Sequence, residues 1–463
     1  MKKVRFFAAL GAFLLTAVCL TAPFTASAQE GYPLAEGLTL AAPSAIVVYV
    51  DPSVSGKEAL AKNIDSVLFA QEADVAFRPG PLNRLALGLA AMKIIERKQI
   101  DMDTATGEYT YALFDLYVAG TGLTVANMDF GEEWTIRDLL RLSMVDTAAD
   151  AATVLAHMLG GSVQLFIDEM NTVAAELGCT NTHFVNVNGA DESEQYTCAR
   201  DVYKMLRRCL DYPDLADMMA VSEVTVEPVS GGYDRSWAST NKLLRQEYYY
   251  EPAVLGKTGA ADGCYSLASV AEADGYRYIT VVAAAEERDA QYPDTIALFR
   301  WAFNQFTYKS LLADGQPVTR VPIKNAWQTD TVNLVAERPV SCLVVEDLDE
   351  HTVTRKVTLY DDLLDEDGAL QAPVSKGAAV GKVELFIRTD QKIGEVELIV
   401  AESVKRSEVM YIGSSLGAFF SSPWFWAVAI LLLLLIGGYL ILLYRYNNST
   451  KRRKSKKKYK SLK

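Results

Sequence analysis

Histidine and cysteine are scarce in this chain of 463 residues, which contains three and six of them. The histidines are His157, His183 and His351, and no CxxC pair occurs, so the sequence favours neither a histidine-rich metal site nor a catalytic triad centred on histidine. Five cysteines follow residue 28, too sparse and too irregularly spaced for a disulfide framework. We therefore expect no metal, no other cofactor and at least one unpaired thiol.

Basic residues are unevenly distributed, and the body of the chain has few of them. Ten Lys or Arg and no acid lie in residues 445–463, and three more lie in residues 1–28. The stretch between holds the other 32 of the 45 basic residues and all 58 acidic ones, a net charge of −26. A body this acidic lacks the electrostatic footprint of a nucleic-acid-binding protein, so we expect no nucleic-acid partner.

The first 28 residues have the order of a secretory signal peptide. Lys2, Lys3 and Arg5 precede an apolar run over residues 6–20, and small residues follow up to Ala28, where we expect cleavage. The alternative, an N-terminal membrane anchor, is less favoured because the apolar run is short.

Residues 424–443 form a run of twenty residues without a charge, long enough to cross a bilayer as one helix. The basic tail over residues 444–463 follows at once, and the positive-inside rule places such a tail in the cytoplasm. The sequence therefore predicts a single-pass membrane protein whose body lies outside the cytoplasm. A nucleic-acid role for the tail is the alternative, and a topology anchor is the simpler explanation.

The pattern between the two ends predicts an α/β domain over residues 43–310. Residues 82–95 are almost wholly apolar and follow Pro81, which suits a first helical turn, so we expect a buried helix there. Thr135 and Asp138 have the spacing of a helix-capping pair. Residues 45–50 and 66–70 look like a hairpin. Further helices are expected at 148–159, 163–177, 198–210 and 295–306, and further strands at 221–229, 263–271 and 276–284.

The character of the sequence changes after this domain. Short alternating runs separated by turns predict a small all-β domain over residues 311–404, and residues 405–423 then form a linker to the membrane helix.

Four segments carry motifs with a recognisable order along the chain. They are NTHFVNVNGAD at residues 181–191, STNKLL at 239–244, Lys257-Thr258-Gly259 and QAPVSKGAAVG at 371–381. Together they resemble penicillin-binding proteins and serine β-lactamases, in particular the D-alanyl-D-alanine carboxypeptidase family of low-molecular-mass penicillin-binding proteins. The first two segments are similar to the family's NTHFxNxxGLD and NTNxLL, the third to its Lys-Thr-Gly strand, and the fourth to its C-terminal β domain.

The resemblance implies an antiparallel sheet flanked by helices with a helical subdomain, then a β domain. It also implies acyl transfer in peptidoglycan metabolism at a bacterial cell membrane. In such enzymes a serine at the start of a buried helix attacks the D-Ala-D-Ala carbonyl, and a lysine three residues later activates it. A Ser-x-Asn element assists proton transfer, and the Lys-Thr-Gly strand binds the substrate carboxylate.

Two of these three motifs are degenerate here. The nucleophile position falls on Pro81, which has no nucleophilic group, and the base position falls on Arg84, which stays protonated at physiological pH. The Ser-x-Asn element falls on Thr147 and Ala149, so its amide is lost. Substrate-binding residues Lys257, Thr258 and Gly259 are complete.

At three positions we expect a structural role rather than a catalytic one. We expect Thr147 to cap a helix rather than replace the nucleophile. Arg84 is expected to pair with an acid, and Asp150 is the candidate, because an unpaired buried charge is costly. We expect His183 to be a hydrogen-bonded core residue rather than an acid or base.

Three functions are compatible with this pattern. The first is an inactive, membrane-anchored homologue of the carboxypeptidases that binds a peptidoglycan stem peptide or a cell-envelope protein. The second is an active carboxypeptidase with a rearranged nucleophile, for which Thr147 is the motif-derived candidate. The third is a structural assembly protein with a vestigial cleft.

Overall fold

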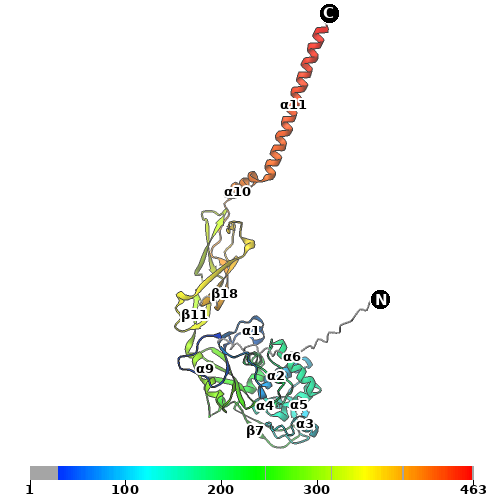
Figure 1. Ribbon diagram of the computed structural model, residues 1–463, viewed down its shortest axis with the longest axis vertical. Coiled ribbons are helices and arrows are strands. Elements are labelled where there is room, and N and C mark those ends of the chain that lie inside the picture. The colour runs from blue at the N-terminus through cyan, green and yellow to red at the C-terminus, as the bar shows by residue number, and fades with distance from the viewer. Residues whose placement is uncertain (1–29, 246, 314, 388–390, 461–463) are drawn as a thin grey trace, which may run out of the picture. The chain divides into compact units, whose positions relative to one another are not determined.

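The computed structural model describes residues 30–245, 247–313, 315–387 and 391–460. The expected signal peptide lies outside these residues. The chain divides into two compact units, residues 1–305 and 306–463 (Figure 1).

A six-stranded antiparallel sheet forms the centre of the first unit, in the order β1-β3-β2-β10-β9-β8. The strands are β1 (Glu30–Gly31), β2 (Ser44–Tyr49), β3 (Ser66–Gln71), β8 (Ala253–Ala261), β9 (Cys264–Ala273) and β10 (Tyr276–Ala285). Every residue of β2 is buried, as expected for a strand covered on both faces. Because β2 pairs with β10, the two ends of this unit share one sheet.

The expected antiparallel pairing of β2 with β3 is confirmed, and the connection between the two strands contains a helix. Helix α1 (Gly56–Lys62) lies between the two strands, and the Ser55 side chain caps it by accepting from the Glu58 N–H. The Gly56 segment that suggests a turn therefore begins a helix.

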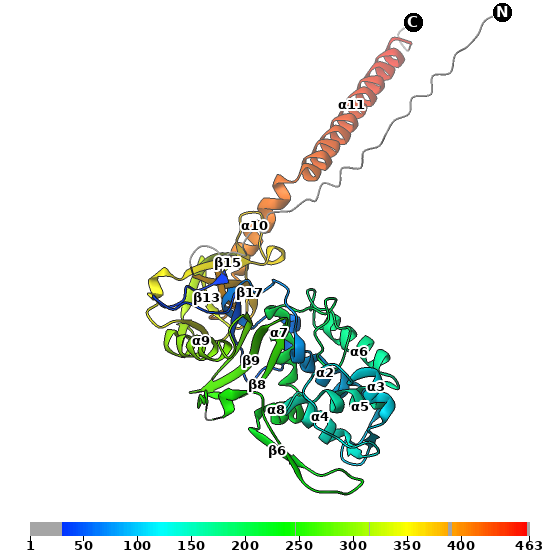
Figure 2. The same ribbon diagram turned by 60° about the horizontal axis from the view of Figure 1, so that its bottom comes forward.

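Helices pack on both faces of this sheet. Helix α9 (Gln291–Gln305) covers one face at β9 and β10, and α7 (Ala199–Cys209) contacts β2, β9 and β10 from the other (Figure 2). The predicted buried helix is α2 (Arg84–Lys98), preceded by the short 3-10 helix η1 (Gly80–Asn83). It contacts α4, α5, α6 and α7, so it runs through the helical subdomain.

The remaining elements of this unit complete the helical subdomain and its edges. They are α3 (Tyr111–Tyr117), α4 (Ile136–Val145), α5 (Ala149–Gly160), α6 (Val163–Glu176), α8 (Pro213–Ala220), η2 (Lys242–Leu244), and the paired strands β4 (Thr106–Glu108) with β5 (Glu133–Thr135) and β6 (Glu223–Val226) with β7 (Arg235–Ala238). The predicted cap is confirmed, since the Thr135 side chain accepts from the Asp138 N–H at the start of α4.

The second unit is built from strands followed by two helices. A six-stranded sheet has the order β15-β17-β18-β13-β12-β16, and β11 pairs with β14. The strands are β11 (Phe306–Leu312), β12 (Pro317–Lys324), β13 (Thr331–Ala336), β14 (Val340–Val345), β15 (Thr354–Leu359), β16 (Leu370–Gln371), β17 (Ala379–Ile387) and β18 (Gln391–Val400); short 3-10 turns are η3 (Glu350–Thr352) and η4 (Asp361–Leu363). Buried Leu334, Val383 and Leu398 belong to its apolar core.

Two helices end the described chain: α10 (Glu408–Ser421) lies in the expected linker, and α11 (Pro423–Lys460) follows. Pro423–Asn448 is long and apolar enough to cross a membrane, and it contains the predicted residues 424–443. The predicted fold class, an α/β domain followed by an all-β domain and one apolar C-terminal helix, is confirmed.

Candidate functional site

The 3-10 turn η1, which leads into α2, packs closely against strand β8, which carries the Lys-Thr-Gly motif. A Cβ added to Gly259 would lie 2.5 Å from the Pro79 carbonyl oxygen, and one added to Gly80 would overlap the Ala260 carbonyl. Gly80 also has a φ of +49°, which favours glycine. Pro81 lies in this turn and is half-buried. Glycines on both sides therefore bring the nucleophile position and the Lys-Thr-Gly strand together.

Arg84, at the base position, is fully buried and is held by four oxygen atoms. Its Nη1 donates to Asn83 Oδ1 at 2.8 Å and to the Val187 carbonyl at 2.5 Å. Its Nη2 donates to the carbonyls of Thr147 and Asn188, both at 3.0 Å. The guanidinium therefore joins the start of α2 to the Ser-x-Asn position and to the 181–191 segment.

Burial lowers the pKa of Arg84 to about 9, and the charge of Asp150 opposes that shift. The guanidinium is therefore still protonated at neutral pH and cannot accept a proton from a nucleophile. Its Nε has no hydrogen-bond partner in the structure.

The expected pairing of Arg84 with Asp150 is wrong. The Asp150 carboxylate instead accepts backbone N–H groups, from Ala126 at 2.9 Å and Met128 at 3.4 Å, and it makes no ion pair within the described parts of the chain. Burial raises the pKa of Asp150. The carbonyls around Arg84 take the place of the acid, because four neutral acceptors satisfy a planar guanidinium without burying a second charge.

Thr147 does not cap α5, so that expectation is also wrong. The capping residue of α5 is Ala148, whose side chain has no hydroxyl to offer. Thr147 is buried with a φ of +65°, an unusual conformation for a β-branched residue, and its carbonyl accepts from Arg84. Ala149 begins the helix and is buried.

Lys257 is buried near these residues with 1% of its surface exposed. Its Nζ donates to the Met144 carbonyl at 2.9 Å, just before the Thr147 turn. Burial and then the nearby charge of Arg84 lower the pKa of Lys257 well below its ordinary value, while Asp146 opposes the shift. Burial in turn raises the pKa of Asp146 to about 6. Arg84, the Lys257 amine and one weakly acidic carboxyl thus lie close together in the site.

Thr258 and the segment before β8 complete the site. Thr258 is half-buried, and its Oγ1 donates to Thr240 Oγ1 at 2.7 Å. The Thr240 carbonyl accepts from the Tyr292 hydroxyl at 2.9 Å. The STNKLL segment therefore packs along the Lys-Thr-Gly strand, which explains why the two occur together in the family pattern.

The structure thus brings the sequence-predicted positions together around one turn. Pro81, Arg84, Thr147 and the Lys-Thr-Gly strand converge, and Ala149 starts the helix beside Thr147. Sequence reasoning missed Asn83, Val187 and Asn188, because backbone carbonyls leave no mark in a sequence. The NTHFVNVNGAD segment is the signal that locates two of them.

His183 does not belong to the core, contrary to expectation. Its side chain is exposed, and its ring lies 6.1 Å from the Tyr196 ring. Its backbone pairs with Tyr196 in both directions. His183 is therefore joined to Tyr196 by backbone hydrogen bonds and not by a hydrogen bond of its imidazole.

The fold and this convergence of motif positions define a protein of the penicillin-binding class. The chain belongs to the D-alanyl-D-alanine carboxypeptidase family, because the family model with that description matches residues 49–287. A model described as the C-terminal domain of penicillin-binding protein 5 matches residues 306–406. The resemblance found in the sequence is confirmed.

Similar proteins agree with this assignment. D-alanyl-D-alanine carboxypeptidase DacF of Bacillus subtilis is 26% identical over 413 residues, covering 88% of this chain and 96% of the relative. DacD of Escherichia coli is 26% identical over 332 residues, covering 70% and 80%. The crystal structure of DacD from Francisella tularensis matches in fold with a TM-score of 0.62 at 19% identity, covering 81% of this chain and 96% of that one.

Proposed function

We propose that this chain is a catalytically silent member of the carboxypeptidase family that binds peptidoglycan stem peptides at the outer face of a bacterial membrane. The observation that supports this most is Arg84, a protonated guanidinium with four oxygen acceptors at the position of the general base. Loss of nucleophile and base together removes the unit that performs acyl transfer, and losing one member of such a unit already costs about a million-fold in rate.

Retained binding is supported by the intact Lys-Thr-Gly strand. Thr258 is half-buried beside Pro81's turn, so a carboxylate has a hydroxyl to approach there. The positive charge of Arg84 favours an anionic group such as the terminal carboxylate of a D-Ala-D-Ala peptide, and the Lys257 amine lies in the same site. A membrane-anchored binding protein would capture or shield stem peptides without cleaving them.

The experiment is covalent labelling of the full chain in membranes with a fluorescent penicillin, read by mass after denaturation. The named DacF relative serves as the positive control. We expect no adduct on this chain while DacF is labelled. A stoichiometric adduct would show instead an active enzyme with a rearranged nucleophile, and the labelled peptide would show whether Thr147 supplies it.

Non-covalent binding of a D-Ala-D-Ala peptide then separates the binding protein from a structural protein with a vestigial cleft. We expect binding that Lys257→Ala weakens and Lys93→Ala does not. Lys93 lies in surface ion pairs with Glu169 and Glu176, so it is a matched control. Absence of both adduct and binding would favour the structural role.

A further inference from the structure

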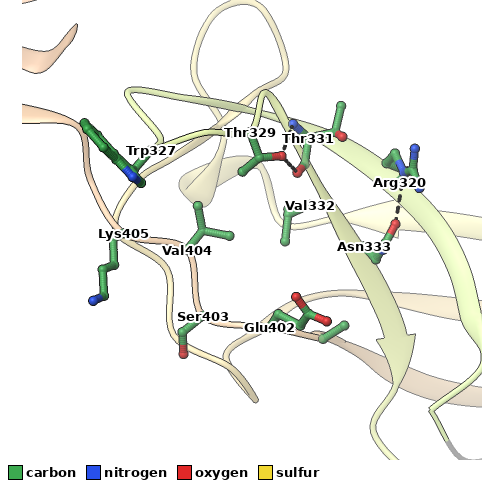
Figure 3. A pocket seen from close by; sticks show the side chains of 11 residues that line it. Arg320, Trp327, Thr329, Thr331, Val332, Asn333, Glu402, Ser403, Val404 and Lys405 are labelled. Carbon is green, nitrogen blue, oxygen red and sulfur yellow. Dashed lines mark hydrogen bonds between the residues drawn. The ribbon is translucent and has the colours of Figure 1, made fainter.

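A groove in the second unit is lined by polar side chains and one exposed indole. It has a volume of about 490 Å³ and lies between the segment that enters β13 and the segment that follows β18 (Figure 3). Its walls include Arg320, Trp327, Asn333, Glu402 and Lys405. Trp327 and Lys405 lie at one end of the groove, and Arg320 and Asn333 at the other (Figure 3).

The two walls are held together by backbone hydrogen bonds, so the groove is a formed feature. The Trp327 N–H donates to the Lys405 carbonyl at 2.8 Å, and Ala326 pairs with Arg406 beside it. On the far wall the Ser403 hydroxyl accepts from the Lys376 N–H at 2.9 Å. These contacts fix the positions of the groove's side chains before any ligand arrives.

Several donors and acceptors of the groove are uncommitted within the described chain. Arg320 uses its Nε for Asn333 Oδ1 at 3.0 Å, which leaves its two terminal nitrogens and the Asn333 amide nitrogen available. No hydrogen bond or ion pair joins the side chain of Glu402 or Lys405 to another residue in the described part of the chain. The Arg320 guanidinium, with two adjacent donors, and the Glu402 carboxylate, with two adjacent acceptors, therefore line opposite sides of the groove.

Trp327 gives the groove an apolar face as well. Its surface is 56% exposed, an unusual position for so large an apolar side chain. A flat indole at one end of the groove and bidentate polar groups toward the other (Figure 3) match a chain of pyranose rings, each of which has a face of C–H groups and a rim of hydroxyls. An apolar peptide helix would leave Arg320 and Glu402 desolvated and unpaired, which is costly.

We propose that this groove binds an oligosaccharide of N-acetylated hexoses, the chemical class of a cell-wall glycan. Trp327 stacks on one sugar ring, and Arg320, Asn333 and Glu402 bond the hydroxyl and amide groups of a ring further along the strand. The site is separate from the one around Arg84, so glycan binding does not depend on the proposed peptide binding. It would let the protein hold a glycan strand while the first unit meets the peptides attached to it.

The competing occupant is an anionic lipid headgroup. Residues 401–405 lead within three residues to α10, so the groove is close in sequence to the membrane-anchoring end of the chain. Arg320 and Lys405 suit a phosphate, but Glu402 in the same groove repels one. A neutral ring with hydroxyls uses both signs of charge, and for that reason the glycan is favoured.

The test measures binding of a tetramer of β-1,4-linked N-acetylglucosamine to the full chain in phosphatidylcholine nanodiscs by calorimetry. We expect Trp327→Ala to weaken binding about tenfold or more and Glu402→Gln to weaken it measurably. Tyr308→Ala is the matched control, because Tyr308 is an exposed aromatic residue of the same unit outside the groove. The control should bind like the unchanged chain.

Hydrogen exchange on the same nanodiscs distinguishes the two occupants. We expect the tetramer to protect amides in residues 326–333 and 401–405, and added phosphatidylglycerol to leave them unchanged. No binding at about 10 mM tetramer, equal weakening by Trp327→Ala and Tyr308→Ala, or protection by phosphatidylglycerol alone would each overturn the proposal.

Discussion

Arg84 has a structural role at the position where the sequence predicts the general base of the family. Its guanidinium satisfies three main-chain carbonyls from two loops and one side-chain amide, all within the buried site. A lysine has one ammonium with three donors, whereas a guanidinium has five donors in a planar fork. An arginine at this position therefore connects more of the motif segments than a lysine could.

Replacement of Arg84 by methionine should destabilise the first unit strongly. Methionine keeps much of the side-chain volume but leaves four buried acceptors without a donor, so we expect a loss of about 3–5 kcal/mol in the free energy of unfolding. Denaturant unfolding measures it. Arg288→Met is the control, because Arg288 is exposed. Similar stability of both variants would show that the Arg84 hydrogen bonds contribute little.

Asp146 should make stability depend on pH in a defined direction. Burial, and to a lesser extent the Asp150 charge, raises its pKa from 3.8 to about 6, while Lys257 opposes the shift. Because the pKa of Asp146 is higher in the folded state than in the unfolded state, folding favours the protonated carboxyl. The contribution of Asp146 to the free energy of unfolding is therefore fully present below about pH 4 and is lost as the pH rises through 6.

The measurement compares the unchanged chain with Asp146→Asn, which cannot titrate, so that all other groups cancel. We expect the unchanged chain to lose about 1–2 kcal/mol relative to the variant between pH 4 and pH 7, a value reduced for the partial exposure of Asp146. Parallel stability profiles across this range would contradict the expected shift.

At the scale of elements, contact between η1 and β8 depends on glycine. Gly259→Ala would place a Cβ 2.5 Å from the Pro79 carbonyl and 2.8 Å from Leu82 Cγ, so the strand and the turn must separate. We expect a loss of about 2–3 kcal/mol in thermal or denaturant unfolding. Gly263→Ala is the control: its Cβ meets open space, and only its φ of +72° costs about 1 kcal/mol. An equal loss for both variants would contradict the close packing.

Elements with a strong local signal could be predicted from the sequence. Pro81 and the apolar run after it locate α2, and Thr135 with Asp138 locates the start of α4. Both signals are local, because the first N–H groups of a helix lack partners: a proline has no N–H, and a capping side chain accepts one. Helix α1 was missed, since Gly56 is typical of a turn and the capping role of Ser55 is visible only once the helix is known.

The candidate site could be predicted only in part, for a related physical reason. The motif positions follow from side-chain identities, and those meet in space as expected. The partners of Arg84 are mostly main-chain carbonyls, which every residue carries, so the sequence pointed to Asp150. Thr147 likewise has the residue type of a cap, but it has a positive φ and lies one residue before the actual cap, Ala148.

At the scale of the whole molecule, charge and apolar length together determine the expected topology. Residues 445–463 carry ten basic residues, the stretch 29–444 carries a net charge of −26, and the uncharged run 424–443 of the apolar helix Pro423–Asn448 directly precedes the basic tail. Moving the basic tail across a membrane is disfavoured, whereas an acidic body has no such restriction. We therefore expect the tail to be cytoplasmic and both folded units to be outside.

A fluorescent-protein fusion tests this topology, because such a protein becomes fluorescent in the cytoplasm but not after export in the unfolded state. Fused after Lys463, it should be fluorescent in membranes of a bacterial host. Fused after Val404, upstream of α10 and α11, it should be exported and dark at equal expression. Both fusions share the N-terminal segment and the chain up to Val404, and they differ in residues 405–463, which contain α10, the apolar helix and the basic tail. A dark full-length fusion beside a fluorescent truncated one would reverse the orientation. The proposed binding of cell-wall peptides and glycans would then lose its basis, because both units would face the cytoplasm.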